Sequence, residues 1–120
     1  MKVENVKSII GTGAKALIKA SFVKQGFTVN DIEKLTLSFL KKYKKCFKNK
    51  TILFPYTKTI LKKLKSKGYQ IVLVSNKPEY YSKELLRHFG ILKYFSYISG
   101  GDTFDFRKPD ARHLKQTIKK

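Results

Sequence analysis

The chain has 120 residues and a formal net charge of +19, and 42% of its residues are apolar, including 9 Phe and 7 Tyr. Enough apolar side chains are present to build a core, which excludes an intrinsically disordered chain despite the charge. No apolar run approaches the roughly 18 residues of a transmembrane helix, and Met1–Glu4 lacks the charged-then-apolar pattern of a secretory leader.

The N-terminal part is predicted to be helical. Apolar residues recur at helical spacing over residues 3–24, with a break at Gly11-Thr12-Gly13, which predicts one or two helices. A further helix is expected over residues 31–47, with Asn30 as its N-cap and Glu33 as the partner in a capping box. Both helices are amphipathic, so the hairpin that they form needs another surface on which to pack.

The pattern changes after Pro55, where alternating helices and strands are expected. A helix ends at Gly68, and its apolar face is predicted to comprise Ile60, Leu61 and Leu64. Residues 70–74 form a short continuous apolar run rich in β-branched side chains. Such a run predicts a strand that is buried on both faces.

A helix over residues 79–89, a strand at 97–99 and a last helix from Asp110 complete the order. Alternating helices and strands are typical of a parallel sheet with crossover helices. Two strands are too few to form a stable parallel sheet, so we expect part of the sheet to be missing. The chain is expected to divide into a helical subdomain at 1–50 and a partial α/β core at 51–120.

Two interpretations of the positive charge stay open. A basic chain attracts phosphate backbones, so a non-enzymatic module that binds nucleic acid or anionic surfaces is one alternative. However, 24 of the 27 basic residues are Lys, and they are spread along the whole chain. Bidentate phosphate contacts and base readout favour Arg. The excess of Lys therefore favours compositional drift in an A- and T-rich genome and predicts only non-specific nucleic-acid binding. The single cysteine, Cys46, cannot form an internal disulfide and predicts a cytoplasmic protein.

Three polar segments follow the predicted strands, where open parallel sheets bind ligands. They are Ser75-Asn76-Lys77-Pro78, Gly100-Gly101-Asp102 and Arg107-Lys108-Pro109-Asp110. A serine hydroxyl and a lysine ammonium can hold a phosphoryl group, and Asp102 can cap or orient a neighbour. Taken singly, each segment also fits an ordinary turn, and Lys108 is one lysine among many.

Taken together, these segments resemble the haloacid-dehalogenase phosphatases in order and spacing. Among the members of that family, they are most similar to the phosphoglycolate phosphatases. The resemblance covers residues 4–110 and includes Leu53-Phe54-Pro55, Val72-Leu73-Val74-Ser75-Asn76, Gly100-Gly101-Asp102-Thr103 and Lys108-Pro109-Asp110. It implies an incomplete α/β core of that family, preceded by its helical cap. It also implies a magnesium-dependent hydrolase of small phosphate monoesters such as 2-phosphoglycolate, acting through an aspartyl-phosphate intermediate.

The resemblance assigns roles to individual residues. Ser75 matches the motif whose hydroxyl binds the phosphoryl oxygen, and Asn76 shapes the same site. Lys108 matches the motif whose ammonium steadies the nucleophile and the phosphate. In the cap, Ile10-Gly11-Thr12-Gly13-Ala14-Lys15 resembles the start of the segment that closes over the substrate. By this resemblance Thr12, Gly13 and Lys15 are expected to contact the distal end of the substrate.

The chain also departs from the family pattern at both ends. It contains no Asp-x-Asp-Gly-Thr, the family's nucleophile motif, and Asp31 is followed by Ile-Glu-Lys instead. The acidic motif that holds Mg²⁺ lies on a later strand in the family, and no such pair follows Lys108-Pro109-Asp110 here. We therefore expect a catalytically incomplete chain without a metal site of its own, whose missing strands come from another chain if it is active.

Overall fold

The computed structural model describes residues 11, 13–22, 26 and 28–120. The chain divides into two compact units, Met1–Phe47 and Lys48–Lys120. The first contains the helices α2 (Ala14–Phe22) and α3 (Val29–Cys46). The apolar positions expected to form a helix over residues 3–10 lie outside the described residues.

Helices α2 and α3 pack against each other and bury Ile18 and Ile32. The predicted N-cap of the second helix is wrong, because α3 begins earlier and Thr28 caps it. The Asp31 carboxylate accepts the Thr28 backbone N–H at 3.0 Å, and the Thr28 side chain accepts the Asp31 N–H in return. The hydrogen bonds from Thr28 hold the pKa of Asp31 below its ordinary value. Glu33 takes no part in the capping box, because Asp31 occupies the N3 position once Thr28 is the cap. The Glu33 carboxylate pairs with Lys15 at 3.0 Å instead.

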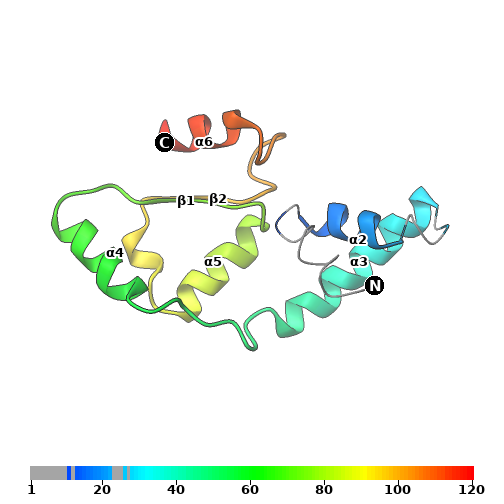
Figure 1. Ribbon diagram of the computed structural model, residues 1–120, viewed down its shortest axis with the longest axis horizontal. Coiled ribbons are helices and arrows are strands. Elements are labelled where there is room, and N and C mark those ends of the chain that lie inside the picture. The colour runs from blue at the N-terminus through cyan, green and yellow to red at the C-terminus, as the bar shows by residue number, and fades with distance from the viewer. Residues whose placement is uncertain (1–10, 12, 23–25, 27) are drawn as a thin grey trace. The chain divides into compact units, whose positions relative to one another are not determined.

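The second unit is an α/β layer structure, as the sequence predicts. Its elements are α4 (Thr57–Ser66), β1 (Val72–Val74), α5 (Glu79–His88), the 3₁₀ turn η2 (Leu92–Tyr94), β2 (Tyr97–Ser99) and α6 (Ala111–Ile118). The strands lie between α6 on one side and α4 and α5 on the other (Figure 1). The 3₁₀ turn was not predicted from the sequence.

Strands β1 and β2 pair in parallel, which confirms the predicted sheet type. Val72 lies opposite Tyr97, and Val74 lies opposite Ser99. Within the described residues the sheet has these two strands only. The expectation that the first strand is buried on both faces is wrong, because all three residues of β1 are only half-buried. The paired segment is also shorter than residues 70–74.

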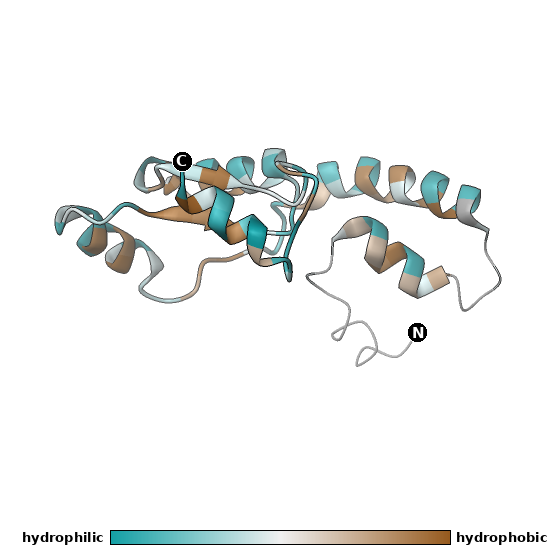
Figure 2. Cartoon of the chain, turned by 90° about the horizontal axis from the view of Figure 1, so that it is seen from above, coloured by the Kyte–Doolittle hydropathy of each residue, from teal (hydrophilic) through white to brown (hydrophobic). Residues whose placement is uncertain are grey.

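The core of the second unit lies between the strands and the helices α4 and α5. Its buried residues are Leu61, Leu86, Ile91 and Ile98. All three residues of β1 are hydrophobic (Figure 2), whereas β2 contributes Ile98 to the core and ends at the polar Ser99. The predicted buried face of α4 is correct for Leu61, whereas Ile60 is 54% exposed. Ile60 and Leu61 are neighbours on a helix and point about 100° apart, so only one of them can face this thin core.

Among the described residues, no helix combines the length and the apolar character that crossing a membrane requires.

Candidate functional site

Ser75 lies at the carboxyl end of β1, where its backbone continues the strand pairing. The Ser75 N–H donates to the Ser99 carbonyl at 2.9 Å, and the Ser75 hydroxyl oxygen accepts the Lys77 N–H at 3.1 Å. The hydroxyl proton is not used in that second bond, so it remains able to hydrogen-bond an anion. The turn therefore holds the serine in one place at the edge of the sheet.

The Ser75-Asn76 turn is joined to the loop that carries Lys108. The Asn76 side-chain amide donates to the Lys108 carbonyl at 3.0 Å, across 32 residues of sequence. Lys108 precedes a cis peptide bond to Pro109, and its side chain is exposed. This contact brings together the Ser75-Asn76 segment and the Lys108 segment, which were separate candidates in the sequence.

The segment Gly100–Thr103 is not a plain turn, because it is anchored to the start of α5. The Glu79 N–H donates to the Asp102 carboxylate at 2.7 Å, so Asp102 caps α5 from a distant position in the chain. This confirms the predicted capping role, which Pro78, the local N-cap, cannot fulfil with its own side chain. The Thr103 hydroxyl donates to the Glu79 carboxylate. Hydrogen bonds from Lys83 and then from Thr103 lower the pKa of Glu79.

Gly100 and Gly101 allow this loop to lie directly on the backbone of the Ser75 turn. The Gly101 N–H donates to the Lys77 carbonyl at 2.9 Å. A Cβ atom on Gly100 would lie 2.2 Å from the Glu79 nitrogen, and one on Gly101 would lie 2.4 Å from the Asn76 carbonyl oxygen. Neither position has room for a side chain, so both glycines are required by the close approach of two backbones.

The loop before α6 is stabilised by contacts among its own residues and the first turn of the helix. The Asp110 side chain accepts the Arg112 N–H at 2.9 Å and caps α6, and the Arg112 guanidinium also binds this carboxylate through its Nε and NH2 groups. The same guanidinium lies 4.7 Å from the centre of the Phe106 ring, which stacks on Phe104. The Arg112 guanidinium lowers the pKa of Asp110 from 3.8 to about 2 and has its own pKa raised in return.

This pKa shift predicts a loss of order around α6 in acid. The folded-state pKa of Asp110 is depressed, so its stabilising contribution is complete above about pH 4 and is lost as the pH falls toward about 2. We expect amide protection of the first turn of α6 to decrease over this range. In Asp110→Asn, which keeps a capping side chain without the carboxylate, the protection of α6 should be lower at neutral pH and should not change with acid. Protection that is equal in both proteins at every pH contradicts the assignment. Amide exchange followed by NMR measures it.

Sequence reasoning missed His113 and Ser99, both of which are fully buried. The His113 Nε2 and the Ser99 Oγ are 2.6 Å apart. The hydrophobic pattern of α6 does not mark the buried face of the helix, since its apolar residues Leu114 and Ile118 are 50% and 65% exposed while His113 is fully buried. The available signal was the polar pair His113 and Thr117, which lie one helical turn apart and share a face.

The acidic residues of the described part do not form a metal centre. No group of three His, Cys, Asp or Glu side chains there is arranged to hold a metal ion. Asp102 caps α5, Glu79 pairs with Lys83, and Glu84 pairs with Lys48 and Arg87. These carboxylates bind backbone amides and cations of the protein, so they do not fit the oxygen cage that Mg²⁺ requires.

The cap residues that are predicted to contact the substrate lie in the first unit. Gly13 precedes α2 with a φ of 99° and accepts the Leu17 N–H at 2.9 Å. The Lys15 ammonium pairs with Glu33, and both side chains are 58% exposed, so this pair contributes little stability. Thr12 lies outside the described residues. Substrate contact by these residues stays a prediction.

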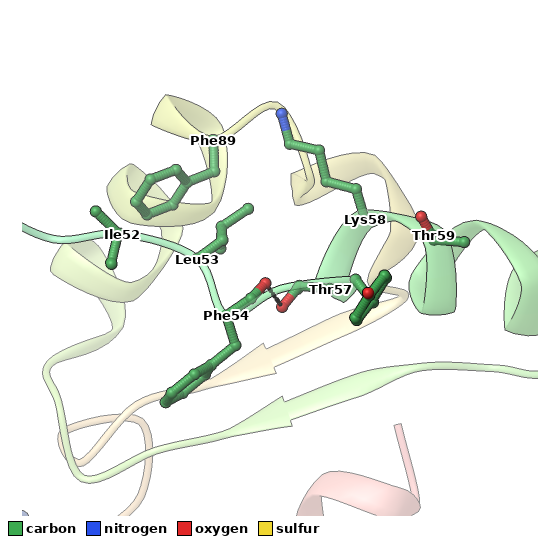
Figure 3. Close-up of a pocket in the computed structure, with 8 residues that line it drawn as sticks. Ile52, Leu53, Phe54, Thr57, Lys58, Thr59 and Phe89 are labelled. Atoms are coloured by element: carbon green, nitrogen blue, oxygen red, sulfur yellow. Dashed lines mark hydrogen bonds between the residues drawn. The ribbon is translucent and has the colours of Figure 1, made fainter.

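An open pocket of about 420 Å³ lies on the second unit, away from the predicted site residues. Its wall comes from the segment before α4, from the first turn of α4 and from Phe89. Ile52 and Phe54 are 85% and 86% exposed. Figure 3 shows the Thr57 hydroxyl donating to the Phe54 carbonyl beside this pocket, at 2.8 Å. None of the polar segments that follow the strands lines it.

A parallel α/β layer with a serine turn after one strand and a lysine loop joined to it is the arrangement expected for a haloacid dehalogenase-like protein. The sequence matches the haloacid dehalogenase-like hydrolase family over residues 1–120. The chain therefore belongs to this family, which confirms the resemblance drawn from its motifs.

The similar proteins include several phosphoglycolate phosphatases. The chain is 33% identical to that of Agrobacterium fabrum over 119 residues, covering 98% of this chain and 51% of the relative, and 35% identical to that of Aquifex aeolicus over 118 residues, covering 96% and 52%. A crystal structure described as a predicted phosphoglycolate phosphatase from Haemophilus somnus superimposes with a TM-score of 0.86 at 29% identity, covering 97% of this chain and 55% of that one. The chain thus spans about half the length of the curated relatives that it matches.

Proposed function

We propose that this chain supplies the phosphate-binding half of a phosphatase that hydrolyses a small phosphate monoester such as 2-phosphoglycolate. The observation that carries the proposal is the hydrogen bond from the Asn76 amide to the Lys108 carbonyl, which joins the serine turn to the lysine loop. A hydroxyl donor and an ammonium at the carboxyl ends of parallel strands suit a phosphoryl group. The similarity to phosphoglycolate phosphatases supports the choice of substrate.

In this proposal, each predicted site residue has a distinct role. The Ser75 hydroxyl donates a hydrogen bond to a phosphoryl oxygen, and the Lys108 ammonium balances the negative charge that develops during transfer. Asn76 fixes the lysine loop through the Lys108 carbonyl. In the cap, Thr12, Gly13 and Lys15 contact the part of the substrate farthest from the phosphate.

We further propose that the 120-residue polypeptide is catalytically incomplete by itself. It contains no Asp-x-Asp-Gly-Thr, and without that nucleophile the aspartyl-phosphate intermediate of the family cannot form. Magnesium dependence rests on the family resemblance alone, because the described residues do not fit a Mg²⁺ site. Activity then requires the remaining strands, from another chain or from further sequence. The lone exposed thiol of Cys46 supports a cytoplasmic location.

The test is to replace the matching segment of the Aquifex aeolicus relative with residues 1–120. We expect this chimera to release phosphate from 2-phosphoglycolate, and the isolated 120-residue chain to match a blank without protein. A folded chimera with no activity contradicts the proposed function. Turnover by the isolated chain that is lost in Ser75→Ala contradicts only the claim of incompleteness.

The alternative function, a basic binding module, is favoured by the net charge of +19. We expect nucleic-acid binding that is weak, indifferent to sequence and steeply reduced by salt, because dispersed lysines act by releasing counterions. A titration of duplex DNA at rising salt measures it. Tight binding that persists at physiological salt and prefers one sequence would replace the phosphatase proposal with this one.

A further inference from the structure

His113 connects two parts of the second unit through both of its ring nitrogens. Its Nδ1 accepts the Lys108 backbone N–H at 3.3 Å, and its Nε2 lies 2.6 Å from the Ser99 hydroxyl at the end of β2. The imidazole has no exposed surface. A buried ring with both nitrogens engaged is fixed in position and in orientation.

These contacts also determine where the ring proton lies. A backbone N–H can donate only to a nitrogen lone pair, so Nδ1 of His113 carries no proton. The neutral ring therefore has its proton on Nε2 and donates it to the Ser99 oxygen. Phe104 packs against the ring in an edge-to-face arrangement, with 5.9 Å between the ring centres.

Lys108 is consequently held by its backbone from two directions. His113 of α6 binds its N–H, and Asn76 of the turn after β1 binds its carbonyl. Ser99, whose hydroxyl is hydrogen-bonded to the ring, accepts the Ser75 N–H through its backbone carbonyl at 2.9 Å. A short chain of hydrogen bonds thus runs from the Ser75 backbone through Ser99 and His113 to Lys108.

We propose that His113 is a positioning residue that sets the place of Lys108 relative to Ser75 in the phosphate site. The inference rests on the proposed function, because the purpose of the placement is to direct the ammonium and the hydroxyl toward one anion. An ordinary core histidine needs only to fill space and satisfy its nitrogens. A positioning histidine must in addition keep an acceptor at the place of Nδ1.

Two substitutions of His113 separate these roles. The side-chain oxygen of Asn in His113→Asn lies near the place of Nδ1 and can still accept the Lys108 N–H. The longer side chain of His113→Gln reaches toward Ser99 instead and leaves the Lys108 N–H without its acceptor. We expect the dissociation constant for inorganic phosphate, titrated into the 120-residue chain, to rise about fivefold or more in His113→Gln and to stay close to that of the unsubstituted chain in His113→Asn.

Two further measurements keep the proposal testable if the substitutions unfold the chain or if phosphate does not bind. In the unsubstituted chain, ¹⁵N NMR of the His113 ring should show a proton on Nε2 and none on Nδ1, and the opposite tautomer overturns the proposal. The Lys108 amide should exchange faster in His113→Gln than in His113→Asn, and equal rates overturn it as well. Absence of any phosphate response in the unsubstituted chain contradicts the proposed function separately, and the ring and amide results then decide the role of His113.

Discussion

Replacing Gly100 with alanine should destabilise the second unit by roughly 3 kcal/mol or more, the upper end of the cost of overpacking. The new Cβ would lie 2.2 Å from the Glu79 nitrogen and 2.8 Å from the Lys77 carbonyl oxygen. Both neighbours are backbone atoms, which cannot rotate away as a side chain can. The loop must therefore separate from α5 and lose the Asp102 cap. Urea unfolding of the 120-residue chain measures the change.

Gly90→Ala is the matched control. Gly90 has a φ of 68°, and nothing lies within 4 Å of an added Cβ. Alanine there costs only about 1–2 kcal/mol for the left-handed conformation. Gly100→Ala should thus be clearly the more damaging substitution. Equal losses for the two variants, or a smaller loss for Gly100→Ala, would show that the Gly100 segment is not clamped to α5.

Lys108→Ala should have the largest effect on catalysis in the active chimera. Removal of a group that stabilises developing charge lowers kcat by about 10²–10³-fold. The phosphoryl group carries its charge through the whole reaction, so the Lys108 ammonium should contribute both to binding and to the chemical step. Steady-state hydrolysis of 2-phosphoglycolate gives kcat and KM for the variant.

Lys115→Ala removes the same charge from an exposed position of α6 and serves as the control. It should change kcat by less than about twofold, because exposed charges interact weakly through solvent. If the two lysine variants behave alike, Lys108 contributes only to the overall positive field. The assigned role of Lys108 at the phosphate would then be wrong.

The sequence predicted the parallel sheet correctly because short β-branched runs alternated with helical patterns and glycine stops. The sequence-based predictions are wrong where tertiary contacts determine the structure. The apolar run at residues 70–74 predicts a strand that is buried on both faces, yet β1 is half-buried, because burial depends on neighbours that a local pattern does not reveal. The sequence predicts Asn30 as the cap of α3, although the reciprocal hydrogen bonds of Thr28 and Asp31 begin the helix earlier.

The residues proposed for the candidate site could be named from the sequence, whereas their contacts could not. Ser75 and Lys108 stood out because they follow predicted strands and match family motifs. The bonds that hold their loops run over long sequence separations, as from Asn76 to Lys108 and from Glu79 to Asp102. The hydrophobic pattern does not mark His113, and the contacts of its buried ring with Ser99 and Lys108 appear only in the folded structure.

The most direct test of the central claim is a titration of the ¹⁵N-labelled 120-residue chain with inorganic phosphate, followed by NMR at moderate salt. We predict saturable shifts at the amides of Ser75, Asn76, Lys77 and Lys108, which Ser75→Ala and Lys108→Ala abolish and Lys115→Ala leaves unchanged. Shifts that spread over the many surface lysines, do not saturate and survive in Lys108→Ala would contradict the claim that these two loops form one phosphate site.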